Sequence, residues 1–434
     1  MNVLKRIKTD SVNSFVDEKF ARGVAWNLIS FVIMGIAGVL LNVVIARFYP
    51  PETLGVFNIF FASYVVISQA SVLGLHASVL RHTTLYAADR KTLSTLVTSA
   101  LVLTAASSGI TCAILWLGRN LLGSIFGSPG VSVAFTAGML GMFFFPINKV
   151  LLSHLNGLRR MASFAVGNSS RYLLIIIAVI CLYGFKQPGN TLTASFSIAE
   201  GFLFVYLIAA NWRNLGIGDP GDWGFWVKKH LSFGIRGMFG GILNELNSRI
   251  DILVAGLFLD VKTVGIYSFA AFIAMGISQV LNVFRSNYDP IIARLSHEGL
   301  LDDLHSMISK GKMTVLKGML AVAILGIGLY PWIIPRVTGG NEYDSSWLPF
   351  AILMFGIWMR SGFTPFEGLL VQSGHPAKQS GLILSVAFVS LVGNLCFIPL
   401  WGMVGGALAS LVSQVFFIFM LKALVYRVFH RSMI

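Results

Sequence analysis

The chain has 434 residues, of which 56% are apolar and only 12% are charged, and its mean hydropathy is +0.77. Soluble domains carry about 25% charged residues because their surfaces face water. This composition therefore excludes a soluble fold and indicates a polytopic membrane protein. A formal net charge of +14 is compatible with nucleic-acid binding, but in a membrane protein we expect the basic residues to meet anionic lipid headgroups instead, and no nucleic-acid partner.

Apolar runs long enough to cross a hydrocarbon core of about 30 Å as helices recur along the whole chain. We expect an all-α fold with about twelve transmembrane helices. In chain order they cover residues 23–46, 54–80, 93–117, 131–153, 164–184, 191–212, 231–259, 263–288, 313–335, 347–372, 379–399 and 403–426. The connections between them leave no room for a separate soluble domain.

Lysine and arginine are distributed unequally between the two sides of this predicted bundle. Twenty-one lie in or beside the tails and the even-numbered connections, whereas the odd-numbered connections hold five. Those five are Arg47, Arg119, Lys186, Lys262 and Arg336. Because basic loops stay in the cytoplasm, we expect both termini on that side of a bacterial cytoplasmic (inner) membrane.

The two halves of the chain resemble each other at an offset of 210 residues. Thr53 and Gly55 align with Thr263 and Gly265, and the tripeptide at 67–69 recurs at 277–279. Since the offset contains six spans, the halves enter the membrane from the same side and form a parallel repeat with a pseudo-two-fold axis along the membrane normal.

This repeat predicts two six-helix lobes. The expected divisions are a cytoplasmic N-tail at 1–22, an N-lobe at 23–212, a cytoplasmic linker at 213–230, a C-lobe at 231–426 and a cytoplasmic C-tail at 427–434. The linker contains Gly216, Gly218, Pro220 and Gly221, which are typical of a non-helical connection.

No motif for nucleotide phosphates is present, so ATP is not the expected energy source. Cys112, Cys181 and Cys396 stand singly within apolar spans, which offers neither a disulfide framework nor a metal site. We expect no metal, no cofactor and no catalytic residues.

Charged residues within the spans are the candidate functional residues, because a charge at bilayer depth costs at least about 2.5 kcal/mol unless it faces the protein interior or water. Basic ones outnumber acidic ones, which favours an anionic cargo. The candidates for binding an anionic headgroup are Lys149, Arg171, Arg249 and Arg360. The candidates for ion coupling are Glu200, Glu245, Asp251 and Glu367.

Two of these pairs have a helical spacing. Glu245 and Arg249 are four apart on one face and are expected to pair, either as a structural ion pair or as a coupling device. Arg360 and Glu367 are seven apart, with Pro365 between them expected to kink the helix. Amides on the first spans of each lobe, such as Asn42 and Asn58, either bind sugar hydroxyls or bridge helices.

Three segments resemble Wzx-type polysaccharide flippases, the O-antigen and exopolysaccharide flippase family of the superfamily that also holds multidrug extruders and lipid II flippases. The first is Phe-Tyr-Pro-Pro-Glu-Thr-Leu-Gly-Val-Phe at 48–57, followed by Arg81. The second is the turn at 340–344, and the third is the Pro-Leu-Trp-Gly-Met-Val-Gly-Gly-Ala run at 399–407. Together they extend over nearly the whole chain.

The resemblance implies a transporter rather than an enzyme. Two lobes would rock about a central cavity and move oligosaccharide units linked to polyprenyl pyrophosphate, as required for lipopolysaccharide or exopolysaccharide synthesis. It also implies membrane lipids, a coupling proton or sodium ion, and the polysaccharide polymerase and chain-length machinery as partners.

Two alternatives stay open. A multidrug or cation antiporter of the same fold would line its cavity with acids and aromatic residues, whereas here embedded basic residues are in excess. A membrane-embedded polysaccharide polymerase usually needs an external loop with paired acids, and the connection at 118–130 contains none.

Overall fold

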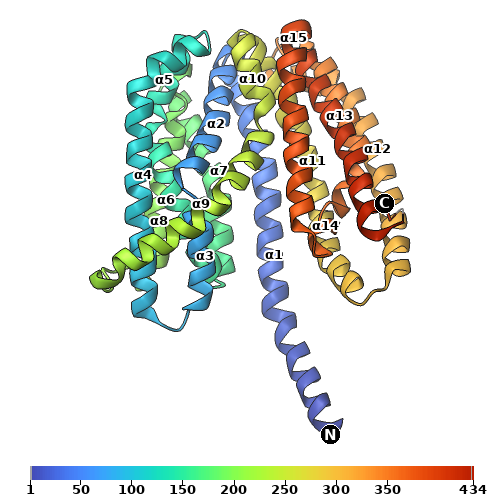
Figure 1. The fold of residues 1–434 in the computed structure, drawn as a ribbon. Coiled ribbons are helices and arrows are strands. Elements are labelled where there is room, and N and C mark those ends of the chain that lie inside the picture. The colour runs from blue at the N-terminus through green and yellow to red at the C-terminus, as the bar shows by residue number, and fades with distance from the viewer. Residues whose placement is uncertain (1, 432) are drawn as a thin grey trace.

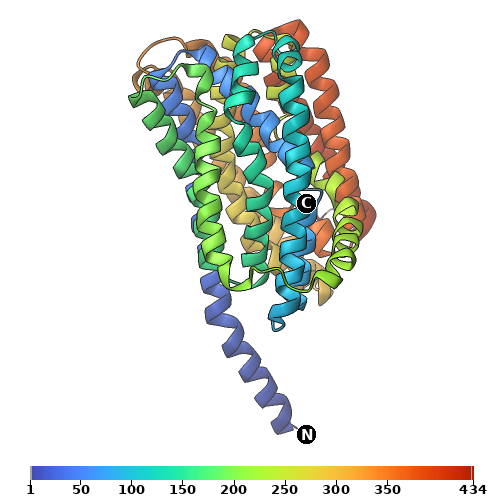
Figure 2. The same cartoon turned by 90° about the vertical axis from the view of Figure 1, so that its left-hand side faces the viewer.

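The structure, a computed structural model, describes the backbone of residues 2–431 and 433–434. Side chains are described from residue 23 onward, except at positions 24, 28 and 432. The side chains of the predicted basic tail at 1–22 therefore lie outside the described residues. The described chain is helical throughout, with short connections, and its long helices run side by side as a bundle (Figures 1 and 2).

Eight helices precede the central linker. They are α1 (Asn2–Phe48), α2 (Pro51–Ser71), α3 (Leu75–Leu85), α4 (Arg90–Ile125), α5 (Pro129–Ala137), α6 (Met139–Gly157), α7 (Met161–Gly184) and α8 (Ala194–Asn211). Seven follow it, namely α9 (Trp223–Asn247), α10 (Ile250–Phe258), α11 (Val261–His297), α12 (Leu301–Thr338), α13 (Trp347–Ser361), α14 (Leu369–Gln372) and α15 (Pro376–Phe429). Short 3₁₀ turns join several of them.

All twelve predicted spans fall on described helices, which confirms the polytopic all-α fold. Eight described helices are individually long and apolar enough to cross a membrane, or nine if α5 and α6 form one bent span. The remaining expected spans are α9 with α10, α13 with α14, and a second span within α15, which has a non-helical residue at Gly402.

The expectation of continuous helices is wrong for several spans, and glycine or proline marks most of the breaks. Leu73 and Gly74 take left-handed backbone angles between α2 and α3. Gly402 has a positive φ within α15, at the predicted connection between the last two spans. The break after α13 contains Pro365, as its kink prediction required. The break between α9 and α10, at Ser248 and Arg249, has neither residue type and was not foreseen.

The two lobes meet where α2 crosses α11, at glycines related by the 210-residue repeat. A Cβ atom on Gly55 would collide with the carbonyl oxygen of Val261, and one on Gly265 would collide with that of Pro51. Small residues let membrane helices approach this closely. The crossing therefore requires glycine at both positions, which explains why the two sequences coincide there.

Other repeat-related positions also contact each other across this crossing. Asn58 donates to Ser268 at 2.8 Å and to Asn42 at 2.9 Å, so these amides bridge helices. Glu52 lies 3.8 Å from Lys262. Both Asn58 with Ser268 and Glu52 with Lys262 are separated by 210 residues. Residues that contact their own repeat equivalents must lie close to the pseudo-two-fold axis, which therefore passes between α2 and α11.

We call the end of the bundle with the α1–α2 and α10–α11 turns the upper end, as drawn in Figure 1. The opposite, lower end carries the α3–α4 turn and the linker before α9. At this end Asp219 of the linker receives a hydrogen bond from Lys91 at 2.9 Å. That bond and the N–H of Gly221 lower the pKa of the Asp219 carboxyl.

Helix α9 begins at Trp223, earlier than the predicted span, and packs against the first lobe. Its Gly234 backbone touches Gly74. His230, fully buried, contacts Ser78 Oγ at 2.9 Å and the carbonyl oxygen of Leu96 at 3.1 Å. The first helix after the linker is thus held on the lobe that precedes the linker.

Replacing Gly55 with alanine should destabilise the protein, because the added methyl group forces the α2–α11 crossing apart. Overpacking of this kind typically costs about 1 to 3 kcal/mol. Gly109→Ala in α4 is the matched control, since a Cβ there meets nothing within 4 Å and alanine is the better helix former. Thermal unfolding in detergent should show a lower midpoint for Gly55→Ala only; equal midpoints would contradict the crossing.

Candidate functional site

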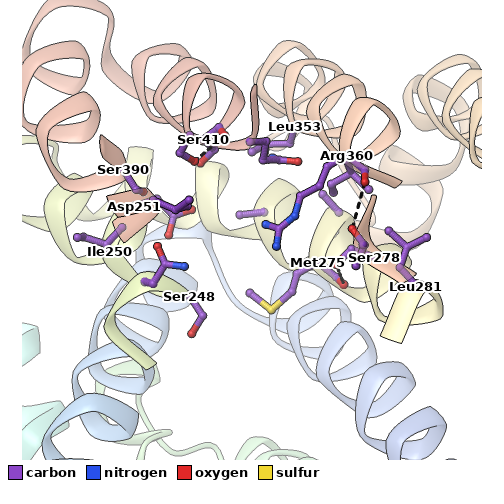
Figure 3. A pocket seen from close by; sticks show the side chains of 18 of the residues that line it. Ser248, Ile250, Asp251, Met275, Ser278, Leu281, Leu353, Arg360, Ser390 and Ser410 are labelled. Carbon is purple, nitrogen blue, oxygen red and sulfur yellow. Dashed lines mark hydrogen bonds between the residues drawn. The ribbon is translucent and has the colours of Figure 1, made fainter. Parts of the chain in front are cut away.

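The second lobe contains a polar cavity of about 360 Å³ bounded by α10, α11, α13 and α15 (Figure 3). This volume falls within the usual range of small-molecule sites, about 300 to 1,000 Å³. Its amides and hydroxyls come from Asn247, Gln279, Asn282 and Gln414 and from Ser248, Ser278, Ser390, Ser410, Ser413 and Thr364. Three charged candidates also line it, namely Asp251, Arg360 and Glu367.

Arg360 extends into this cavity from α13 (Figure 3). Its guanidinium lies 3.1 Å from Glu367 and 3.9 Å from the centroid of the Phe417 ring. Arg285 approaches the same carboxylate at 3.7 Å. The break at Pro365 turns the chain so that Glu367 faces back toward Arg360. Glu367 is therefore neutralised between the two arginines, while Arg360 remains part of the cavity lining.

Asp251 lies on the opposite wall of the cavity, near Ser390 and Ser410 (Figure 3). Its carboxylate accepts hydrogen bonds from the Tyr267 hydroxyl at 2.9 Å and from the Ile252 N–H at 2.9 Å. Within the described part of the chain, no lysine or arginine forms an ion pair with it. Asp251 is thus an acid beside a polar cavity without a basic side chain to neutralise it.

Arg249 lies at the break between α9 and α10, where the two lobes meet. Its guanidinium carbon is 4.5 Å from the ring centroid of Phe61 and 5.3 Å from that of Phe272. These rings come from α2 and α11, one from each lobe, and stack on each other with centroids 6.0 Å apart. Cation–π contact of this kind supplies part of the solvation that a buried guanidinium loses.

The predicted pairing of Glu245 with Arg249 is wrong. The helix ends at Asn247, and the chain turns before α10 begins at Ile250, so the two side chains no longer share a helical face. Among the described side chains, Arg249 has no carboxylate within ion-pair distance. It is only 8% exposed, and its Nε and Nη1 atoms have no hydrogen-bond partner in the protein.

In the first lobe, by contrast, the embedded acid Glu200 has an ion-pair partner within the same lobe. Arg171 of α7 lies 2.5 Å from Glu200 of α8, whose side chain is fully buried. Tyr64 donates to the same carboxylate at 3.1 Å and Asn148 donates at 2.8 Å. The Arg171 guanidinium also covers the Phe145 ring at 4.3 Å. This network satisfies both charges, so neither is available to a ligand without breaking the pair.

Lys149 lies near this network but outside it. Its ammonium group donates to the side-chain oxygen of Gln69 and lies 5.9 Å from the centroid of the Phe145 ring. Lys149 is half-buried, and in the described region it forms no ion pair. It therefore stays inside the bundle instead of reaching to the headgroups.

The aromatic partners of these charges were not predicted. Phe61 and Phe272 enclose Arg249, while Tyr64 and Tyr267 each donate to an embedded carboxylate. Tyrosine in an apolar span is a usable signal, because its buried hydroxyl needs a partner. The phenylalanines carry no such signal, since the sequence has 34 of them and most spans contain several.

No metal centre is formed by the described residues, where no group of three or more His, Cys, Asp or Glu side chains lies close enough to hold an ion. The site is therefore a set of positioned charges, amides and hydroxyls, which suits binding and release of a polar ligand.

Removing Arg171 should destabilise the protein more than removing Arg360, because it leaves Glu200 charged in a dry environment. Breaking a buried pair in this way costs about 3 to 5 kcal/mol. We expect Arg171→Ala to lower the amount of folded protein, measured by size-exclusion chromatography from membranes, and Arg171→Ala with Glu200→Gln to restore most of it. A double variant as depleted as the single one would contradict this assignment.

Comparison with known proteins identifies the family. The family described as "Polysaccharide biosynthesis protein" matches residues 20–296, which is more than half of the chain. A search of the curated proteins finds no match.

Solved structures with the same fold are transporters. The lipid II flippase MurJ in an inward closed conformation matches with a TM-score of 0.73 at 12% identity, over 93% of this chain and 87% of that one. A multidrug resistance MATE transporter of the MOP superfamily, in an inward-facing conformation, matches with a TM-score of 0.70 at 15% identity, over 91% of this chain and 94% of that one. The Vibrio cholerae MATE transporter VcmN in its bent form matches with a TM-score of 0.55 at 12% identity, over 94% of this chain and 97% of that one. The chain is therefore a polytopic membrane protein that belongs to the polysaccharide biosynthesis protein family and shares its fold with these transporter structures.

Proposed function

We propose that this protein is a secondary-active flippase that moves polyprenyl-pyrophosphate-linked oligosaccharide across a bacterial cytoplasmic membrane for O-antigen or exopolysaccharide synthesis. The observation that carries the proposal is Arg249, a buried cation without a carboxylate partner among the described residues, placed where the two lobes meet. A buried cation that no described carboxylate approaches within ion-pair distance is suited to an anion supplied from outside. Family membership supports a polysaccharide pathway.

In this proposal the lower end faces the cytoplasm, as the distribution of basic residues predicts. The lipid-linked unit enters from the inner leaflet while its prenyl chain stays in lipid. A reporter fused after the C-terminus tests the orientation directly, because an extracytoplasmic signal there would invert the pathway.

The pyrophosphate is assigned to Arg249, with Arg360 and Lys149 as further cationic contacts. We assign Arg171 to structure instead, because Glu200 already neutralises it. A guanidinium makes two parallel hydrogen bonds to a phosphate, whereas an ammonium acts as a point charge. Arg249 has two nitrogen atoms without protein partners, which matches that requirement.

The sugars are assigned to the cavity of the second lobe. Its amides and hydroxyls offer both donors and acceptors, and Glu367 and Arg360 add charged ones. Sugar hydroxyls require such a mixed lining because each both donates and accepts. Asn247 and Ser248, which directly precede Arg249, line the cavity. A headgroup bound at Arg249 would therefore place the attached sugars beside the cavity.

Ion coupling is assigned to Asp251, among the four acids considered. Glu200 and Glu367 are held by arginines at 2.5 and 3.1 Å. Glu245 lies half-buried on α9 outside the cavity lining. Asp251 faces the cavity with serine hydroxyls nearby and without a basic partner among the described residues, so a proton or a sodium ion can neutralise it.

Replacing Arg249 with alanine should abolish transport without loss of folded protein, since no carboxylate is left unpaired by the change. Cells that lack the native gene and carry Arg249→Ala should show no surface polymer at normal protein abundance. Arg249→Lys should restore a part of it if charge alone suffices, and none if two-point phosphate contact is needed.

Arg119→Ala is the matched control for this experiment. Arg119 also stacks on an aromatic ring, that of Trp116 at 4.6 Å, but it is partly exposed and lies near the end of α4. The Arg119→Ala variant should leave the amount of surface polymer unchanged. Normal polymer with Arg249→Ala would refute the headgroup assignment, and export of cationic drugs in place of polymer would favour an antiporter.

Asp251→Asn should remove the charge that the coupling ion neutralises, while its amide oxygen keeps the hydrogen bond from the Ile252 N–H and its NH₂ group donates to the Tyr267 hydroxyl. In proteoliposomes we expect substrate flipping that no longer responds to a proton or sodium gradient, with substrate binding retained. Glu342→Gln, at an exposed turn, is the control and should respond as the unmodified protein does. A gradient response preserved in Asp251→Asn would transfer the coupling role to another acid, with Glu245 the next to test.

A further inference from the structure

Two lysines of the second lobe converge on one aromatic ring, away from the polar cavity. The Lys312 ammonium of α12 lies 4.6 Å from the centroid of the Phe363 ring, and that of Lys422 on α15 lies 5.2 Å from it. Phe363 is itself buried at 7% exposure. We call these residues the lysine pair. Neither lysine lines the cavity of the proposed site.

The position of the pair is fixed by packing. The Lys312 side chain lies over Gly362, where an added Cβ would stand 3.1 Å from its Cγ atom. A larger residue at Gly362 would push the lysine away from the ring. The two ammonium groups are thus brought together by three helical segments, α12, the end of α13 and α15.

The two ammonium groups repel each other, and no acid of the described side chains lies within ion-pair distance to offset this. The ring attracts each cation by about 0.5 to 1 kcal/mol at such a partly exposed place. An anion placed between the two ammonium groups would remove the repulsion and gain two charge-assisted hydrogen bonds.

The surroundings of Lys422 identify the kind of anion. On α15, Phe419 and Tyr426 are 66% and 59% exposed, and with Lys422 they share one face because their spacings are three and four residues. Exposed apolar side chains on a membrane helix face acyl chains, and tyrosine typically marks the headgroup level. Lys422 is seven residues before the end of α15, in the lower half of the bundle (Figure 1), and we place the lipid phosphate groups of that leaflet at this height.

We propose that the lysine pair binds the phosphate of an anionic phospholipid in the leaflet at the lower end. Lys312 and Lys422 contact the phosphate oxygens, the Tyr426 hydroxyl donates a further hydrogen bond at the headgroup, and one acyl chain runs along Phe419. The lipid joins α12 to α15 and so stabilises the second lobe. This inference does not depend on the transported substrate.

The test uses the full-length protein in nanodiscs of phosphatidylcholine, with and without phosphatidylglycerol. We expect phosphatidylglycerol to raise the thermal midpoint and to remain bound in native mass spectrometry. Lys312→Gln with Lys422→Gln should weaken retention about thirtyfold, because each lysine near an anionic surface contributes about fivefold in affinity. Lys310→Gln with Lys317→Gln, on exposed positions of the same helix, is the control and should keep it.

Three results would overturn the proposal. Equal retention of phosphatidylglycerol by the Lys312/Lys422 variant and the control would show that the pair is not the site. An equal rise in midpoint with inorganic phosphate in phosphatidylcholine discs would show a free-anion site instead of a lipid site. Lys312→Arg with Lys422→Arg keeps both charges and should keep retention; loss in that variant with normal folding would also exclude the phosphate contact.

Discussion

The crossing of α2 and α11 is the contact on which the arrangement of the two lobes depends. Gly55 and Gly265 bring the backbones together, and the repeat-related partners around them, Asn58 with Ser268 and Glu52 with Lys262, bind across the same line. Because these residues contact their own repeat equivalents, the interface lies along the pseudo-two-fold axis. One close helix crossing can serve as a pivot on which two lobes rock with little repacking, whereas a broad interface would resist such motion.

Within this frame the embedded charges fall into two kinds. Arg171 and Glu200 satisfy each other and hold helices together, and Glu367 is held by Arg285 and Arg360, of which Arg360 also faces the cavity. Arg249 and Asp251 have no such partners among the described residues and lie at the lobe interface and the cavity wall. Burying an unpaired charge is costly. The presence of two such charges of opposite sign is consistent with two ligands, an anion that neutralises Arg249 and a cation that neutralises Asp251.

Much of the fold was predictable from the sequence, and less of the site. Hydropathy placed all twelve predicted spans on described helices, and the repeat predicted two parallel lobes, because both signals extend over many residues. The partners of the charges depend on which helices meet, which spacing does not reveal. Glu245 and Arg249 have ideal helical spacing but are separated by a break with no glycine or proline, while Arg171 finds Glu200 on another helix. Phe61 and Phe272 become informative only once the lobes are assembled.

The break at Ser248 and Arg249 also has a mechanical consequence. Since α9 is fixed to the first lobe by Gly234 and His230, while α10 lines the cavity of the second, rotation of the lobes must change the backbone between them. The side chain proposed to hold the headgroup is thus attached to the joint itself. A bound anion therefore acts on a residue of the joint itself, so cargo binding and lobe rotation involve the same short segment, Ser248 and Arg249.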